Sequence, residues 1–189
     1  MQILDKDDLE NQADAIVASL QAYLDAGKKV FLTSSFQTQS LPLLHMVSRM
    51  DRPIPVYYTN TGFLFPDTIR FTEDLAGQLN LNVIALKSEV TKLWQTDREG
   101  RFLYTSDQDH CCYLNKVQPL EPVMIEHDIW VNGIRADQSE TRARMAIEVW
   151  APHGCTRELI AETDERGGRW FGMNKIECGL HMDLAEQAL

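Results

Sequence analysis

The residue types that could do chemistry gather near the C-terminal end of the chain. Cys178 is followed by Gly179 and, three residues on, by His181. Arg166 and Arg169 lie shortly upstream. A thiol near cations has a depressed pKa, and the thiolate form is the nucleophile. The same pattern also fits a structural cysteine in a frayed tail, because free cysteine commonly behaves as a small buried hydrophobic residue.

The charge of the chain limits its ligands. Lys and Arg number 18 against 28 for Asp and Glu, so the net charge is −10. This acidic balance argues against binding to nucleic acid or to an acidic membrane, which needs a basic face. A small anionic substrate would need cations concentrated locally. Five arginines lie in the last third of the chain: Arg135, Arg142, Arg144, Arg166 and Arg169.

The size and composition fit one soluble globular domain over residues 1–189, with a C-terminal extension over 150–189 where periodicity is poor. No apolar run is long enough to cross a membrane, and the N-terminus does not resemble a signal peptide. We therefore expect a cytoplasmic protein. In that reducing compartment, four cysteines indicate metal binding or catalysis rather than a disulfide framework.

Strands and helices alternate over most of the chain. Short apolar runs predict strands at 29–34, 55–60, 82–87 and 128–134. Helical spacing predicts helices at 7–26, 40–50, 67–79, 111–127 and 138–146, whereas residues 91–109 are polar and are expected to be irregular. The alternation implies right-handed crossovers, and hence an α/β fold with a parallel twisted sheet and flanking helices.

Ligands of such a sheet bind outside the carboxyl ends of its strands. Ser34 and Ser35 follow the first predicted strand, where hydroxyls and a helix N-terminus favour phosphate; an ordinary helix N-cap is the alternative. Gly62 follows the second strand, where it belongs either to a loop that binds a nucleotide or to a simple turn. Arg135 and Arg142 follow the fourth strand, where they either bind an anion or form the solvated start of a helix.

Four segments resemble, in this order, the adenylyl-sulfate and phosphoadenylyl-sulfate reductase family of assimilatory sulfate reduction. The TNTGFLFPDT and ECGLH segments together make the resemblance specific. It implies an adenine-nucleotide alpha-hydrolase-like sheet, related to the PP-loop fold, with a C-terminal catalytic tail. The similar segments are 33–36 (TSSF), 59–68 (TNTGFLFPDT), 130–135 (WVNGIR) with Gln138, Ser139 and Arg142, and 177–181 (ECGLH).

The resemblance also implies a reaction. The Cys178 thiolate would attack the sulfur of adenylyl sulfate and displace AMP, and a thioredoxin or glutaredoxin dithiol would then release sulfite from the thiosulfonate. His181 would assist Cys178. Guanidinium and ammonium groups would stabilise the anionic substrate. The residues implied to bind substrate are Ser34, Ser35, Gln39, Gly62, Phe63, Lys116, Arg135, Arg142, Arg166 and Arg169. The oligomeric state is left open, and a homo-oligomer is compatible with the sequence.

Cys111 and Cys112 separate two enzyme types within this resemblance. In the family, reductases of adenylyl sulfate carry a Cys-Cys pair, a following lysine and a later C-x-x-C motif, and these four thiolates hold a [4Fe–4S] cluster. Reductases of phosphoadenylyl sulfate lack all four cysteines. Here Cys155 fits the second cysteine of the C-x-x-C, but Pro152 occupies the position of the first. The sequence therefore offers three of the four ligands.

The chain is also shorter than the family between Arg144 and Cys155. Either a segment has been lost, which would weaken cluster binding and substrate closure, or the sequence omits residues that include the fourth cysteine. Three other functions stay open. They are a phosphoadenylyl-sulfate reductase, an inactive nucleotide- or cluster-binding homologue, and an ATP-dependent adenylyltransferase. The last is disfavoured because the Ser34–Ser35 turn lacks the glycines of an SGGxDS motif.

Overall fold

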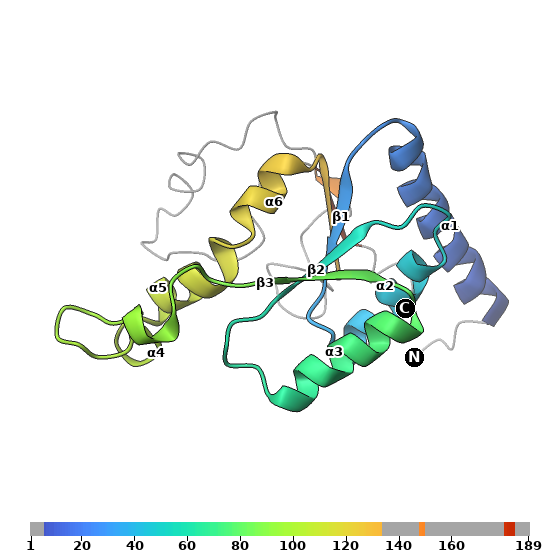
Figure 1. The fold of residues 1–189 in the computed structure, drawn as a ribbon. Coiled ribbons are helices and arrows are strands. Elements are labelled where there is room, and N and C mark those ends of the chain that lie inside the picture. The colour runs from blue at the N-terminus through green and yellow to red at the C-terminus, as the bar shows by residue number, and fades with distance from the viewer. Residues whose placement is uncertain (1–5, 134–147, 150–179, 184–189) are drawn as a thin grey trace.

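A computed structural model describes residues 6–133, 148–149 and 180–183. Its centre is a six-stranded sheet in the order β3-β2-β1-β4-β6-β5, in which only β5 runs antiparallel to its neighbour (Figure 1). The α/β prediction with a parallel sheet is therefore confirmed. The strands are β1 (Val30–Thr33), β2 (Pro55–Thr59), β3 (Asn82–Leu86), β4 (Ile129–Asn132), β5 (Glu148–Val149) and β6 (Leu180–Asp183).

Helices connect the strands where helical spacing predicts them. The first three predicted helices and four predicted strands agree with the structure to within a few residues at either end. The helices are α1 (Lys6–Asp25), η1 (Thr38–Ser40), α2 (Leu41–Ser48), α3 (Pro66–Gln78), η2 (Lys92–Trp94), α4 (Leu103–Ser106), α5 (Gln108–Cys112), a π-helical turn (Tyr113–Val117) and α6 (Glu121–Glu126). The helix predicted over 138–146 lies outside the described residues.

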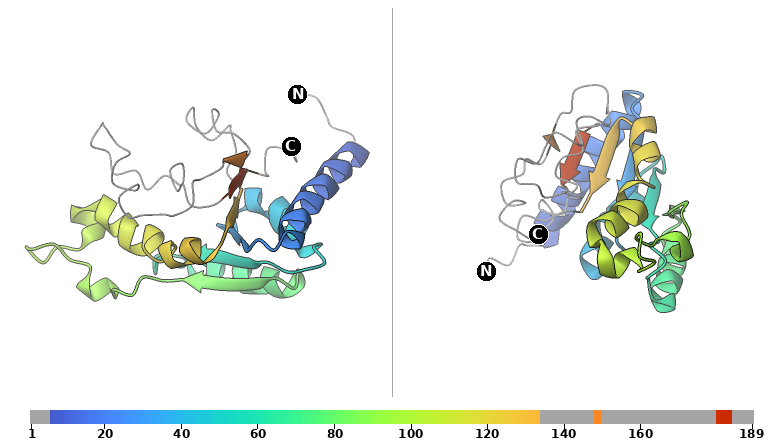
Figure 2. Two further views of the ribbon diagram at one scale, coloured as in Figure 1. Left: turned by 90° about the horizontal axis from the view of Figure 1, so that it is seen from above. Right: turned by 90° about the vertical axis from the view of Figure 1, so that its left-hand side faces the viewer.

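Two hydrophobic clusters hold the layers together, one on each face of the sheet. On one face, Leu32 and Val131 pack with residues of α1 and α2. On the other face, Phe31 and Trp130 pack with residues 120–124, in and just before α6. Successive residues of β1 thus point to opposite faces, and both are buried, as expected for a central parallel strand. Figure 2 shows α1 and α6 on either side of these strands.

Residues 91–109 are ordered, so the prediction of an irregular segment is wrong. The segment contains η2, a bridge between Thr96 and Phe102, and α4. It extends away from the sheet on the side of α5 (Figure 1). Its polar composition hid this order, because the segment buries only a few side chains, among them Gln95 and Leu103. Local order here comes from turn hydrogen bonds rather than from an apolar stripe.

The single long helix predicted over 111–127 is also wrong. The chain forms α5, then the π-helical turn, and then starts again as α6. Pro122 lies in the first turn of α6, where its missing N–H and fixed φ are tolerated. A wide π turn inside a helical segment is rare in proteins, and the examples that occur often lie at functional sites.

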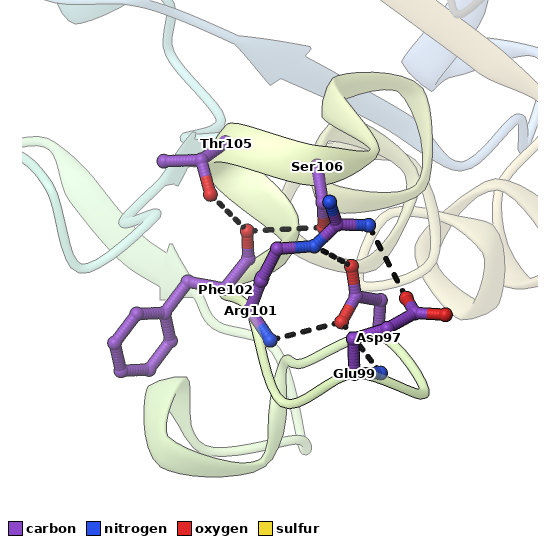
Figure 3. A network of polar contacts seen from close by, with 6 residues as sticks. All are labelled: Asp97, Glu99, Arg101, Phe102, Thr105 and Ser106. Carbon is purple, nitrogen blue, oxygen red and sulfur yellow. Dashed lines mark hydrogen bonds and ion pairs between the residues drawn. The ribbon is translucent and has the colours of Figure 1, made fainter.

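The hairpin between η2 and α4 is closed by Asp97 (Figure 3). The Asp97 carboxylate accepts hydrogen bonds from the backbone N–H and the Nε of Arg101, at 2.9 and 2.8 Å, and from the backbone N–H of Glu99. Burial acts to raise the pKa of Asp97, but the hydrogen bonds from Arg101 and Ser106 outweigh it and lower the pKa to about 2. The ionised carboxylate thus organises this turn.

Replacing Asp97 with Asn should lower the thermal midpoint at neutral pH by a few degrees. A carboxyl group whose pKa is depressed in the folded protein contributes stability above its unfolded pKa near 4. That contribution is lost as the pH falls through the folded pKa of about 2. The difference in melting temperature between wild type and Asp97→Asn should therefore shrink steadily from pH 5 to pH 2. Asp74→Asn, an exposed carboxylate on α3, is the matched control.

The described part of the chain contains no helix that is both long and apolar enough to cross a membrane.

Candidate functional site

The turns after β1 and β2 lie at the same edge of the sheet. Thr33 in β1 is in register with Tyr57 in β2, and the Ser34 N–H donates to the Tyr57 carbonyl at 3.0 Å. The Asn60 N–H donates in the same way to the Leu86 carbonyl of β3, at 2.8 Å. Both turns therefore begin one residue beyond their strands, at the carboxyl edge where parallel sheets bind ligands.

The turn after β1 is fixed by a buried aromatic residue. Phe36 has φ +54°, and its N–H donates to the Ser34 Oγ at 3.1 Å. Its ring is buried against Tyr58, with the ring centroids 5.8 Å apart. A positive φ at a bulky residue is strained, and such strain is typically concentrated at functional sites. Anchoring Phe36 inward leaves Ser34 partly exposed and Ser35 exposed.

Ser34 and Ser35 are not helix N-caps, so that alternative is wrong. In the described structure the N-cap residues of η1 and α2 are Gln37 and Ser40, and neither makes a side-chain cap hydrogen bond. The Ser35 Oγ instead lies 3.2 Å from the Ser40 Oγ. Gln39 stays beside this turn, and its Nε2 donates to the Gln37 Oε1 at 2.6 Å. The hydroxyls of the turn therefore remain at the carboxyl edge of the sheet.

The turn after β2 is built from side chains that fold back on their own backbone. The Asn60 Oδ1 accepts from the Gly62 N–H at 3.2 Å, and the Thr61 Oγ1 accepts from the Phe63 N–H at 3.3 Å. Gly62 has φ +75°, a backbone conformation that residues other than glycine rarely adopt. The Phe63 ring is 52% exposed and meets Tyr104 edge-on, with centroids 5.5 Å apart.

Lys92 lies directly against the Gly62 turn, and no pattern in the sequence predicts this contact. Its Nζ is 4.1 Å from the centroid of the Phe63 ring, within the range of a cation–π interaction. A Cβ atom added to Gly62 would lie only 2.8 Å from the Lys92 Cε. Burial lowers the pKa of Lys92, and its interaction with Cys111 acts in the opposite direction.

A buried polar cluster continues from Lys92 to the double cysteine. The Lys92 Nζ donates to the Asn115 Oδ1 at 2.5 Å. Asn115 and Gln95 are 2% and 4% exposed, and they exchange two hydrogen bonds of 2.7 and 3.0 Å. The Asn115 Nδ2 also donates to the carbonyl of Cys111 at 2.7 Å and lies 3.6 Å from its Sγ. The Gly62 turn and the Cys111 helix thus share one hydrogen-bonded cluster.

Residues 29–153 match the family model described as the phosphoadenosine phosphosulfate reductase domain. The match covers well over half of the chain. The chain belongs to this family. Its strand-end turns and its double cysteine are thus features of a phosphoadenosine phosphosulfate reductase family member, which confirms the resemblance found in the sequence.

Family relatives carry both substrate names. The adenosine 5'-phosphosulfate reductase of Streptomyces coelicolor is 30% identical, over 82% of this chain and 83% of its own length. The phosphoadenosine 5'-phosphosulfate reductase of Shewanella oneidensis is 37% identical, over 68% of this chain and 54% of its own length. The adenosine 5'-phosphosulfate reductase of Chelativorans sp. is 28% identical, over 90% of this chain and 86% of its own length.

The alignment with the Chelativorans relative is longer than this chain. It runs over 211 positions, more than the 189 residues available here. The relative therefore has residues within the aligned span that this chain lacks. That these residues fall between Arg144 and Cys155 stays a prediction from the sequence.

A solved structure has the same fold. The phosphoadenylyl-sulfate reductase of Candida auris, crystallised as a phosphate complex, superposes with a TM-score of 0.59 at 15% identity. The alignment covers 98% of this chain and 82% of that chain. The family member described here therefore has the adenine-nucleotide alpha-hydrolase-like fold expected from the resemblance.

The structure brings only part of the predicted site together. Ser34 and Ser35 lie in the turn after β1, Gln39 lies in η1 directly after it, and Gly62 and Phe63 lie in the turn after β2. Lys116 is exposed on the π-helical turn, four residues beyond Cys112. The other predicted substrate and nucleophile residues lie outside the described residues: Cys178, Arg135, Arg142, Arg166 and Arg169.

His181 lies in β6, where it is in register with Trp130 of β4. β6 runs parallel to β4 and begins with Leu180 beside Ile129. The start of β6 therefore lies at the amino edge of the sheet, opposite to the turns at Ser34 and Asn60. The predicted tail over 150–189 is thus partly a strand of the main sheet.

Cys111 and Cys112 are free thiols with different surroundings. Cys111 is buried and Cys112 is partly buried. A buried thiol that receives an N–H hydrogen bond, as Cys111 does from Asn115, suits a thiolate ligand of an iron–sulfur cluster. Among the described residues no group of three or more His, Cys, Asp and Glu side chains could hold a metal ion. The third predicted ligand, Cys155, lies outside those residues.

Proposed function

We propose that this protein reduces adenylyl sulfate to sulfite and AMP in assimilatory sulfate reduction. The observation that carries the proposal is the shared polar cluster that joins the Gly62–Phe63 turn to the double-cysteine helix. In the resemblance drawn from the sequence, the turn faces the nucleotide and the paired cysteines mark the adenylyl-sulfate type. Family membership supports the same class of reaction.

In the proposed reaction, Cys178 is the nucleophile. Its thiolate attacks the sulfate sulfur and breaks the bond to the phosphate oxygen, so AMP leaves and the enzyme carries a thiosulfonate. One thiolate of a thioredoxin or glutaredoxin then attacks the Cys178 Sγ, and sulfite departs. The second donor thiol resolves the mixed disulfide and regenerates Cys178. Sulfur is reduced by two electrons, and the donor dithiol is oxidised to its disulfide.

The cations of the site would stabilise this chemistry. The transferred group and the leaving nucleotide are both anionic, so guanidinium and ammonium groups around them lower the barrier. We assign this role to Lys116, Arg135, Arg142, Arg166 and Arg169. Ser34, Ser35 and Gln39 would bind the phosphate through their polar groups, and Gly62 with Phe63 would contact the nucleoside. His181 would assist Cys178.

Because β6 begins at the amino edge, the chain that carries Cys178 has to reach across the sheet to attack a nucleotide at the carboxyl edge. Only Gly179 lies between Cys178 and the first residue of β6, and two residues span at most about 7 Å. Cys178 therefore reaches the carboxyl edge only if β6 leaves its place beside β4. The two hydrogen-bonded neighbours of β6 are β4 and the two-residue strand β5. The proposed reaction therefore requires β6 to part from these neighbours.

A [4Fe–4S] cluster would be held by Cys111, Cys112 and Cys155 in this proposal. Cys111 and Cys112 would supply two adjacent thiolate ligands from the end of α5. The chain's own contribution is the polar support around Cys111, chiefly the N–H donor of Asn115. Pro152 stands where the family has the fourth cysteine, so an additional ligand from elsewhere would complete the set.

Phosphoadenylyl sulfate is the second candidate substrate. It is favoured by the 37% identity to the Shewanella oneidensis relative named for that substrate. Both candidates use the same nucleophile and release the same sulfite, so they differ only in the 3'-phosphate of the nucleotide.

The deciding experiment measures sulfite release from each substrate by anaerobically purified protein with thioredoxin and its reductase. We expect turnover of adenylyl sulfate to exceed that of phosphoadenylyl sulfate, together with bound iron and sulfide. A preference for phosphoadenylyl sulfate in an iron-free protein would support the second candidate. AMP binding without sulfite from either substrate would contradict both.

A further inference from the structure

We propose that Lys92 is a positioning residue that holds the Gly62–Phe63 turn in its ligand-binding conformation by anchoring it to the Cys111 helix. This inference rests on the proposed function for the identity of the ligand. Lys92 is not among the candidate residues predicted from the sequence, and its contacts alone support this role.

The Cε and Nζ atoms of Lys92 contact the Gly62–Phe63 turn. Its Cε occupies the space beside the Gly62 Cα, so close that a Cβ on residue 62 would be 2.8 Å away. Its ammonium lies 4.1 Å from the centroid of the Phe63 ring. Besides Lys92, the Phe63 ring meets Tyr104 edge-on, and it is 52% exposed. Lys92 thus contacts both the backbone and the ring of this turn.

The Lys92 ammonium also contacts two buried amide oxygens. The Asn115 Oδ1 accepts from it at 2.5 Å, and the Gln95 Oε1 lies 3.5 Å away. Asn115 is itself fixed by its donation to the carbonyl of Cys111. Moving the ammonium away would leave a charge without its charge-assisted hydrogen bond in a partly buried position, which is costly. The lysine is therefore not a freely mobile side chain.

The Lys92 side chain contacts two segments that lie far apart in the sequence. The turn at residues 62–63 contacts Lys92, and Lys92 contacts residue 115. Within the turn, the Asn60 and Thr61 hydrogen bonds fix the local backbone. They do not fix how the turn sits relative to the Cys111 helix. Lys92 supplies that relation, which a site assembled from both segments needs.

The first test replaces Lys92 with Met, which keeps the stem but removes the charge. In ligand-free protein we expect hydrogen exchange at the Gly62 and Phe63 amides to rise about tenfold, with the β1 amides unchanged. The Kd for AMP should rise about tenfold, and KM should rise while kcat changes little. Lys92→Arg should recover part of each effect. Lys28→Met, at an exposed lysine after α1, should behave as wild type.

The second test uses Gly62→Ala in two backgrounds. In the wild-type background the new methyl group meets the anchored Lys92 stem and also adopts a strained φ of +75°. In a Lys92→Ala background only the strain remains. We therefore expect Gly62→Ala to weaken AMP binding several-fold more in the wild-type background than in the Lys92→Ala background, a coupling measured by a double-mutant cycle.

Unchanged exchange at residues 62–63 in Lys92→Met would overturn the inference, as would equal costs of Gly62→Ala in the two backgrounds. If Lys92→Met does not fold, Lys92→Gln replaces it, with the same exchange readout. Failure of the proposed function would look different. Wild-type protein would then not bind AMP, whereas the exchange measurements on ligand-free protein would still decide the role of Lys92.

Discussion

Cys178→Ser should abolish sulfite formation, lowering turnover by about 10³-fold or more, the scale expected when a covalent nucleophile is removed. A serine hydroxyl at neutral pH is a far weaker nucleophile than a thiolate beside guanidinium groups. Affinity for AMP should be largely retained, because the proposed nucleotide contacts come from the turns after β1 and β2. The measurement is steady-state sulfite release with thioredoxin, combined with calorimetric titration of AMP.

The intermediate gives an independent check of the same residue. Wild-type protein mixed with adenylyl sulfate in the absence of a dithiol should release AMP in a single turnover and gain the mass of one SO₃ group. Peptide mapping should place that group on the peptide with Cys178. Turnover retained in Cys178→Ser, or an adduct located on Cys111 or Cys112 instead, would contradict the proposed mechanism.

Trp130→Ala should destabilise the fold by about 3–5 kcal/mol, the range for truncating a large buried aromatic side chain. Trp130 is 2% exposed, and its ring stacks on Phe31 with centroids 6.2 Å apart. Its Nε1 also donates to the Thr33 Oγ1 at 2.7 Å. Urea unfolding of the full chain measures the effect, and Trp130→Phe should lose less because it keeps most of the ring contacts.

Trp94→Ala is the matched control, because the Trp94 side chain is 80% exposed on η2. Its free energy of unfolding should stay within about 0.5 kcal/mol of wild type. Equal effects of the two substitutions would contradict the central place of Trp130. Since Thr33 immediately precedes Ser34, a folded Trp130→Phe variant should also weaken AMP binding through the altered start of that turn.

The local order of this fold was predictable from the sequence because it is encoded locally. Apolar runs located β1, β2, β3 and β4 to within about two residues. In β1 and β4 the run is continuous because both faces of the strand are buried. The end of α1 was equally clear: Gly27 has φ +78°, and the Lys28 N–H donates to the Tyr23 carbonyl, as in a Schellman motif. The turns at Ser34 and Gly62 followed from the ends of these strands.

Local sequence patterns do not predict order that depends on polar contacts between distant segments. Residues 91–109 were expected to be irregular because their order comes from turn hydrogen bonds around Asp97 and from the burial of Gln95 by Asn115. Asn115 was recognisable only as a residue one helical turn beyond Cys111. No periodicity in the sequence relates Lys92 to Gly62 or to Asn115.

The sequence by itself therefore determined the α/β class, the two turns at the carboxyl edge, the double cysteine and the family. The tertiary structure decided that β6 joins the sheet beside β4, that Ser34 and Ser35 are free of helix capping, and that Lys92 stands between the Gly62 turn and the Cys111 helix. The physical reason is that strands and turns are specified by neighbouring residues. A partly buried charge shared between two segments is specified only by the packing of segments that the chain brings together.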